Sequence, residues 1–180
     1  MRPYSAASRV VCVEKGGTPC AAGYRAANDA GMDAMHTPDA NGWVPWIAKP
    51  DGRFHDLLGQ MYFRVTGNGV ESRMDTDRRH SNGLGFLHGG FLMSFVDMAM
   101  FTIIRPRFAK GEGAVTLSCA TDFLTGGIPG EPIEGRGEVL KETGKLFFVR
   151  GLVTQGGANV VSFTGTMRKI TRRLPPPPTA

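Results

Sequence analysis

The chain has 180 residues, of which 41% are hydrophobic and 21% are charged, and these proportions argue against a disordered, fibrous or membrane-embedded protein. A chain of this length forms one ordinary domain with its own core. The net charge of +5 suits an anionic partner, but the positive residues lie in short separate groups without interleaved exposed aromatic residues, so we expect a solvated basic surface and no nucleic-acid partner.

The longest apolar run extends from Phe91 to Ile104 and is shorter than the roughly 18 residues that a membrane-spanning helix needs. It also contains an acidic residue, so we expect a buried helix and no membrane partner. No apolar segment follows the N-terminal arginines, which predicts no secretory signal and a cytoplasmic location. The three cysteines, Cys12, Cys20 and Cys119, lack C-x-x-C spacing, which predicts free thiols rather than disulfides or a zinc site.

The two ends of the chain differ in composition from its middle. Residues 1–41 are rich in alanine and glycine and show no periodicity, which predicts a flexible N-terminal extension, with Met32 and Met35 as alternative starts of the native protein. Four consecutive prolines near the other end predict a disordered, proline-rich tail over residues 173–180. The folded domain is therefore predicted to span residues 42–172.

A short helical turn and a hairpin are predicted at the start of this domain. The turn spans Phe54–Leu58, and Gln60–Val65 alternates apolar and polar side chains as a half-buried strand does. The dipeptide Asn68-Gly69 follows and is a strong hairpin-turn signal. Val70–Asp75 is therefore predicted to run back antiparallel to the first strand.

A long apolar helix is predicted in the middle of the domain. A glycine-rich loop leads into a helix over Gly89–Arg105, which Pro106 ends. Because a helix that is apolar on nearly every side must be covered, the strands around it predict an α+β architecture, a curved antiparallel sheet with the helix as its filling. Four of those strands follow the helix, separated by glycine-containing turns: Ala114–Leu124, Ile133–Glu142, Lys145–Thr154 and Asn159–Ile170.

The junction between loop and helix carries the pattern N-x-x-G-x-x-H-G-G-x(6)-D, which runs from Asn82 to Asp97. This pattern closely resembles that of the phenylacetic-acid-degradation (PaaI-like) hotdog thioesterases, and the resemblance extends over residues 54–170. The segment from Thr116 to Glu131 also looks like the strand and turn that follow the helix in that family. The resemblance implies a hotdog fold, one sheet wrapped around one central helix, and an acyl-CoA thioesterase that uses no cofactor.

The start of the helix is chemically suited to hold a thioester oxygen. Glycines at Gly89 and Gly90 leave backbone N–H groups sterically open, and the helix dipole favours negative charge there. The Gly89 amide can therefore donate to the oxyanion of the transition state, with Gly90 beside the substrate. We expect His88 to orient the loop, with direct proton transfer as its alternative role. For Asn82, capping the loop and holding the water or the acyl carbonyl are equally open.

Asp97 is the single charge between Phe91 and Ile104. An unpaired buried carboxylate costs several kcal/mol unless it is compensated, so we expect a functional residue, either a general base on water or a nucleophile that forms a mixed anhydride. The resemblance permits both roles. It also implies that Thr116 carries a hydroxyl that steadies the attacking water. Phe91 is an apolar residue of the same helix and a candidate for substrate contact.

Spacing along the helix separates the two predicted catalytic groups. Asp97 lies eight residues beyond Gly89, or about 12 Å at 1.5 Å per residue, so one chain cannot present both to one carbonyl. A twofold dimer can, with Asp97 of one subunit facing the Gly89 loop of the other, and the resemblance implies the same arrangement. We expect a homodimer or a homotetramer built from two such dimers.

Other chemistries lack their sequence signatures. There is no G-x-S-x-G for a serine esterase, no G-x-G-x-x-G or P-loop for nucleotides, and no carboxylate or cysteine to complete a metal site with His80, His88 and Asn82. Two alternatives to the thioesterase remain open. One is a hotdog dehydratase or hydratase with a histidine and acid pair, which the Gly89 and Asp97 spacing disfavours. The other is a non-catalytic acyl-CoA-binding module, against which the intact Asp97 counts. An aromatic and a medium-chain acyl group fit the sequence equally.

Overall fold

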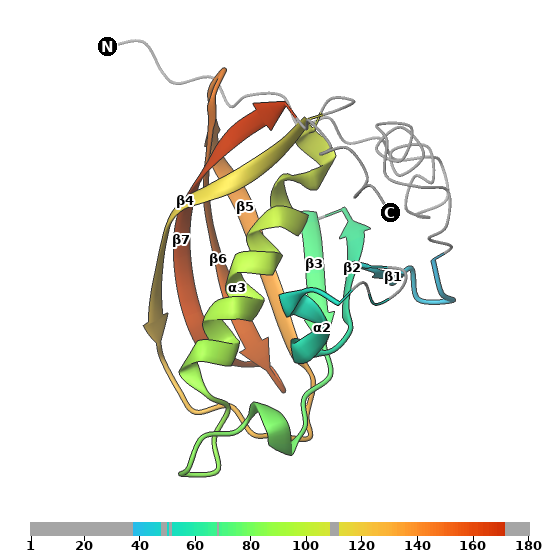
Figure 1. Cartoon of the computed structure of the whole chain (residues 1–180), viewed down its shortest axis with the longest axis vertical. Coiled ribbons are helices and arrows are strands. Elements are labelled where there is room, and N and C mark those ends of the chain that lie inside the picture. The colour runs from blue at the N-terminus through green and yellow to red at the C-terminus, as the bar shows by residue number, and fades with distance from the viewer. Residues whose placement is uncertain (1–37, 48–49, 51, 68, 109–111, 172–180) are drawn as a thin grey trace, which may run out of the picture.

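The computed structural model describes residues 38–47, 50, 52–67, 69–108 and 112–171 (Figure 1). Most of the predicted N-terminal extension and the whole of the predicted tail lie outside these residues. The elements, in chain order, are β1 (Val44–Pro45), α2 (Phe54–Leu58), β2 (Met61–Thr66), β3 (Gly69–Met74), η1 (Arg78–His80), α3 (Gly89–Ile104), η2 (Arg105–Arg107), β4 (Glu112–Phe123), β5 (Ile133–Glu142), β6 (Leu146–Gln155) and β7 (Ala158–Thr171).

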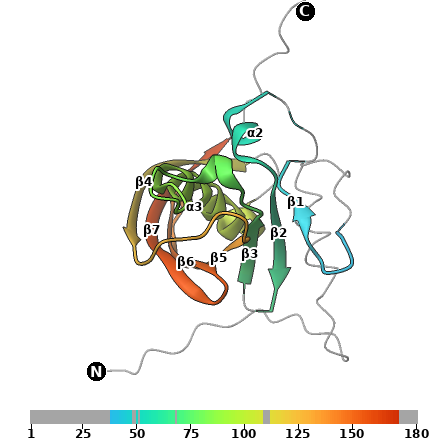
Figure 2. The same cartoon turned by 90° about the horizontal axis from the view of Figure 1, so that it is seen from below.

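The described strands form one antiparallel sheet in the order β1-β2-β3-β5-β6-β7-β4. The sheet curves around α3, which lies along its concave face (Figures 1 and 2). The core forms between them, because Phe95, Val96 and Met100 of the helix and Phe147 and Phe163 of the sheet are almost fully buried. The predicted hotdog fold, a curved antiparallel sheet around one long helix, is confirmed.

Most predicted elements agree with the structure to within one or two residues. The helical turn α2 and the strand β5 have the predicted bounds. Strand β3 begins at Gly69, which pairs with Thr66, so the glycine of the predicted Asn68-Gly69 turn belongs to the strand, and Asn68 lies outside the described residues. Helix α3 ends at Ile104, and Pro106 lies inside the 3-10 turn η2, where the missing N–H of proline is tolerated.

The sheet covers only part of α3, which corrects the prediction that the helix is buried on nearly every side. Met93 is 46% exposed, and Ser94, Asp97, Met98 and Phe101 are half-buried. These residues recur at the three- and four-residue spacing that puts side chains on one helix face. The face formed by these five residues is called the open stripe below. Among the described helices, none has the length and apolar character needed to cross a membrane.

Glycines in the strands allow neighbouring groups to approach the backbone closely. A Cβ atom placed on Gly151 of β6 would overlap the carbonyl oxygen of Arg136 and the ring of Phe163. A backbone oxygen cannot move away without disturbing the ladder between β5 and β6, which pairs Arg136 with Leu152. By contrast, a Cβ on Gly144, in the turn between these strands, meets no atom within 4 Å.

These surroundings predict that Gly151→Ala destabilises the protein by about 1–3 kcal/mol or more, because the added methyl overpacks a fixed backbone. Gly144→Ala serves as the control and should change the free energy of unfolding little, since its φ lies outside the left-handed region. Urea unfolding of both variants measures the difference. Equal stability of the two variants would contradict the prediction.

Candidate functional site

The loop before α3 is shaped by the side chain of Asn82. Its Oδ1 accepts hydrogen bonds from the N–H groups of Leu84 at 2.8 Å and Phe86 at 3.2 Å. A bridge between Ser81 and Leu87 closes the base of the loop. Of the two roles left open for Asn82, the geometry therefore supports the loop-capping one for its oxygen.

His88 caps the N-terminus of α3. Its Nδ1 accepts the N–H of Gly90 at 2.9 Å, and its carbonyl accepts the N–H of Leu92 at 3.0 Å. A Cβ on Gly90 would lie 3.1 Å from that Nδ1, so glycine leaves room for the ring. The Nδ1 of the ring thus holds the helix start, which fits the role expected for His88, and its alternative role in proton transfer stays a prediction.

The Gly89 amide stays available after this capping. Among the described residues, none forms a hydrogen bond to the Gly89 N–H, which is the first helical residue of α3. Helix N-termini leave such donors unsatisfied, and the helix dipole makes their surroundings favourable for negative charge. The ring of Phe123 lies beside this glycine, 3.3 Å from the position that its Cβ would take. The Gly89 N–H at the helix start can therefore donate to an anionic oxygen.

Asp97 lies on the open stripe with Thr116 of β4 as its partner. The Thr116 hydroxyl donates to Asp97 Oδ1 at 2.7 Å. The carboxylate is half-buried rather than fully buried. The free-energy cost expected for burying it is therefore offset partly by contact with solvent and partly by this hydrogen bond. Two predicted site residues, Asp97 and Thr116, are thus brought together, with the hydroxyl bound to the carboxylate itself. The role of Thr116 in steadying the attacking water stays a prediction.

A β-bulge in β4 puts a second polar side chain near Asp97. The pairing with β7 shifts between Thr116 and Ser118, so Thr116 and Cys119 both face α3 although they are three residues apart. The pKa of the Cys119 thiol is raised, first by burial and then by the negative charge of Asp97. Within the described residues, no group of three or more side chains is placed to hold a metal ion.

Two adjoining cavities lie between α2 and α3. One, of about 440 Å³, is lined by Arg53, Phe54, His55, Met93, Ser94, Asp97 and Met98. The other, of about 460 Å³, is lined by Phe54, Leu57, Leu58, Arg79, His80, Ser81, His88, Gly90, Phe91 and Ser94. They share Phe54 and Ser94, so the two cavities adjoin between the helix start and the carboxylate. Phe91, a predicted substrate contact, borders the second cavity but is only 6% exposed.

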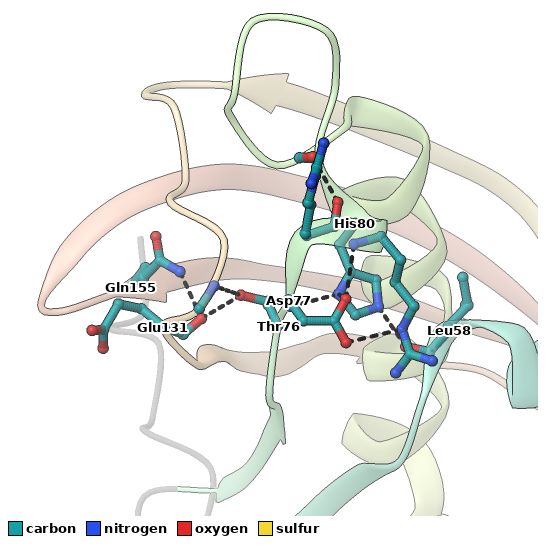
Figure 3. A network of polar contacts seen from close by, with 10 residues as sticks. Leu58, Thr76, Asp77, His80, Glu131 and Gln155 are labelled. Atoms are coloured by element: carbon teal, nitrogen blue, oxygen red, sulfur yellow. Dashed lines mark hydrogen bonds and ion pairs between the residues drawn. The ribbon is translucent and has the colours of Figure 1, made fainter.

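The predicted site residues thus form two groups on one helix. Asn82, His88, Gly89 and Gly90 lie at its start, and Asp97 lies two turns further along with Thr116. Sequence reasoning considered His80 only as a metal ligand and missed its structural position beneath the loop. Its buried ring bonds to Asp77 and Leu58 (Figure 3), contacts that no local sequence signal indicates.

The chain is similar to known proteins in sequence and in fold. The family model described as the thioesterase superfamily matches residues 84–162. A search of curated proteins finds no match. Among solved structures, a mutant of the phenylacetic acid degradation protein PaaI from Thermus thermophilus is 26% identical, with a TM-score of 0.56 and coverage of 64% of this chain and 96% of the other.

Two further solved structures resemble the fold at lower identity. The PaaI protein from the E. coli phenylacetic acid degradation operon is 22% identical, with a TM-score of 0.50 and coverage of 56% of this chain and 72% of that one. A hypothetical thioesterase with coenzyme A from Streptococcus pneumoniae is 20% identical, with a TM-score of 0.56 and coverage of 64% and 93%. Both similarities concern the fold.

The neighbourhood of Cys119 predicts a pH effect that reports on Asp97. Because burial and the Asp97 charge raise the thiol pKa, the thiolate forms, and reacts with iodoacetamide, only at a higher pH than an ordinary cysteine needs. Asp97→Asn removes the second cause, so the midpoint of the alkylation profile should fall but stay above the ordinary value. Replacing Cys12 and Cys20 by serine makes the reaction specific. An unchanged midpoint would show that Asp97 carries no charge near the thiol.

Proposed function

We propose that this chain, a thioester hydrolase whose residues 84–162 match the thioesterase superfamily model, hydrolyses an aromatic or medium-chain acyl-CoA to the free acid and CoA. The observation that carries this proposal is the unused Gly89 N–H at the start of α3, together with Asp97 held by Thr116 on the same helix. Two relatives support CoA as the carrier, since the structure from S. pneumoniae contains coenzyme A and one from Streptococcus mutans is bound to acetyl CoA.

In the proposed reaction, the Gly89 amide donates to the thioester carbonyl oxygen. Attack on the carbonyl carbon converts this oxygen into an oxyanion, which a fixed donor at a helix N-terminus stabilises. Collapse of the intermediate breaks the carbon–sulfur bond, and the CoA thiolate then takes up a proton. His88 contributes by keeping Gly90 and the first helical turn in place.

Asp97 is the proposed source of the attacking group, either as a general base that takes a proton from water or as a nucleophile that forms an anhydride which water then cleaves. Thr116 occupies Oδ1 as a donor, so Oδ2 is the oxygen directed at water or at the acyl carbon. The apolar surface of Phe54, Met93 and Met98 beside Asp97 suits the acyl group.

A second copy of the chain completes the proposed site. The separation of Gly89 and Asp97 by eight residues of α3, about 12 Å, requires the two groups at one carbonyl to come from different subunits. Two surfaces support a homodimer. One is the open stripe, and the other is β4, whose single partner among the described strands is β7 and whose Val115 and Leu117 are exposed.

The same contacts weigh against the two alternatives. A dehydratase or hydratase needs a histidine and an acid that act as a pair, whereas His88, the N-cap of α3, and Asp97 lie nine residues apart in the chain. A non-catalytic binding module has no use for a carboxylate supported by a dedicated hydroxyl. Hydrolysis uses both groups of residues.

Removing the carboxylate tests the proposal. Asp97→Asn should lower kcat about 10²- to 10⁴-fold because the variant lacks the general base or nucleophile, whereas Glu138→Gln, an exposed acid on β5, should retain wild-type activity. Thiol release from a panel of acyl-CoAs measures both. Wild-type rates in Asp97→Asn would exclude its catalytic role, and tight binding without any hydrolysis by the wild type would favour the binding module.

Removing the amide donor is possible without breaking the helix. Gly89 is the first helical residue, where proline is tolerated, and His88 has the extended conformation that precedes proline readily, with φ −68° and ψ 134°. Gly89→Pro should therefore lower kcat about 10²- to 10³-fold by deleting the oxyanion donor. Gly89→Ala keeps the N–H beside Phe123 and should lose much less; equal losses would indicate a steric effect alone.

Mixing the two inactive variants tests the shared site. In a heterodimer of Asp97→Asn and Gly89→Pro, one of the two sites receives an intact Asp97 and an intact Gly89 from different chains. After subunit exchange at equal concentrations, half of the dimers are mixed, so activity should recover to about a quarter of the wild type. Sites contained within single chains would give no recovery, and subunit exchange is verified by mass spectrometry of differently labelled chains.

A further inference from the structure

His80 is a buried histidine whose two ring nitrogens are both used. It is 3% exposed at the end of η1. Its Nδ1 lies 2.9 Å from the backbone nitrogen of Asp77, and its Nε2 lies 2.8 Å from the carbonyl oxygen of Leu58 (Figure 3). An N–H only donates and a carbonyl only accepts, so Nδ1 is the acceptor for Asp77 and Nε2 is the donor to Leu58.

The same residue is attached to the start of α3. Its carbonyl accepts the N–H of His88 at 2.7 Å, the residue immediately before Gly89. Its ring packs against that of Phe91, with centroids 4.2 Å apart and planes inclined by 31°. Gly89 therefore lies between two residues that His80 contacts, one by a backbone hydrogen bond and one by ring packing.

The segment that carries His80 is fixed from the other side by the loop after β4. The Thr76 hydroxyl donates to the carbonyl of Glu131 at 2.6 Å and accepts the N–H of Gly130 at 3.1 Å. Gln155 of β6 donates to the same Glu131 carbonyl at 2.9 Å (Figure 3). The backbone just before His80 is thus connected to the sheet, so movement of the ring relative to this support would displace the helix start.

The hydrogen bond of Nε2 connects the His80 ring to α2. Leu58 is the last residue of this helix, and Phe54, Leu57 and Leu58 line the cavity that His88 and Gly90 border. Because α2 is a single helical turn, few backbone bonds of its own hold its C-terminal end, so the hydrogen bond from His80 fixes the cavity wall at that point.

We propose that His80 is a positioning residue for the thioesterase reaction, an inference that rests on the proposed function. Through Nδ1 it holds the turn before the loop and thereby the Gly89 oxyanion donor. Through Nε2 it holds α2, the wall that contacts the acyl group. The two nitrogens act on different kinetic parameters, because displacing the donor affects the transition state, whereas displacing the wall weakens substrate binding.

Two amide substitutions separate the nitrogens. In His80→Asn, the side-chain oxygen takes the place of Nδ1 and can accept the Asp77 N–H, but the side chain is too short to reach Leu58. In His80→Gln, the terminal amide takes the place of Nε2 and can donate to Leu58, while the acceptor for Asp77 is lost. Both variants lose the ring that packs on Phe91 equally, so their comparison isolates the two hydrogen bonds.

We expect His80→Asn to raise KM about tenfold with kcat within about twofold of the wild type, and His80→Gln to lower kcat about tenfold with KM little changed, since one well-placed hydrogen bond is worth up to about a factor of ten. Both constants are measured with one acyl-CoA that the wild type hydrolyses. If the wild type hydrolyses none of the acyl-CoAs, the proposed function itself is contradicted. If the wild type is active but the two variants do not show these changes, only the inference about His80 fails.

Thr102→Val provides the matched control. Thr102 is fully buried in α3, and its hydroxyl bonds to Ser72 and to the carbonyl of Ala99, both at 2.7 Å, so its loss also removes buried hydrogen bonds but near the far end of the helix. Thr102→Val should lower Tm, and any effect on activity should change kcat and KM together. The inference is overturned if both His80 variants change kcat and KM together, as Thr102→Val does at a similar loss of Tm.

A third variant covers the case in which the amide variants do not fold. His80→Phe keeps an aromatic ring against Phe91 and removes both nitrogens, so it should lower kcat and raise KM together. Circular dichroism confirms that the protein is folded at the assay temperature. Wild-type kcat and KM in folded His80→Phe would overturn the inference as well.

Discussion

The packing of α3 against the concave face of the sheet is the constraint on which the other features depend. The helix presents large side chains to the strands, and the strands accommodate them at glycines, since a Cβ on Gly165 would overlap the sulfur of Met100 and one on Gly135 would lie 3.1 Å from the ring of Phe95. Such interlocking packing fixes both the position of the helix along its axis and its rotation about that axis. The position of the first turn, and therefore the direction of the Gly89 N–H, follows from this packing rather than from the loop alone.

Much of this architecture could be predicted from the sequence because its signals are local. Alternating apolar residues, glycine-containing turns and one uninterrupted apolar run gave six of the seven strands and the helix. The exception is β1, whose two residues are too few for any periodicity and which exists because Val44 and Pro45 pair with Phe63 and Tyr62 of β2. The open stripe was also missed, because apolar composition indicates that a surface is covered but not whether the same chain covers it.

The site was predictable as a set of residues but not as a set of contacts. The spacing from Asn82 to Asp97 identified both groups. It could not show that Asn82 Oδ1 caps two loop amides, or that His88 accepts the Gly90 amide and not the Gly89 amide. Those choices depend on side-chain directions within a folded loop. His80 was harder still, because its partners Leu58 and Phe91 lie 22 residues before it and 11 after it, and only the tertiary structure brings them to one ring.

The separation of the two groups along α3 has a physical reason. A carboxylate near the first turn would accept the Gly89 N–H itself, because unsatisfied amides and the helix dipole attract any nearby anion. The donor would then be occupied before substrate arrived. Two turns further along the helix, Asp97 is beyond the reach of that amide and accepts a hydrogen bond from Thr116, which the bulge in β4 turns toward α3. Both groups therefore keep their reactive atoms available within each chain, and in the proposed dimer they meet at one carbonyl only when a second subunit supplies the missing half.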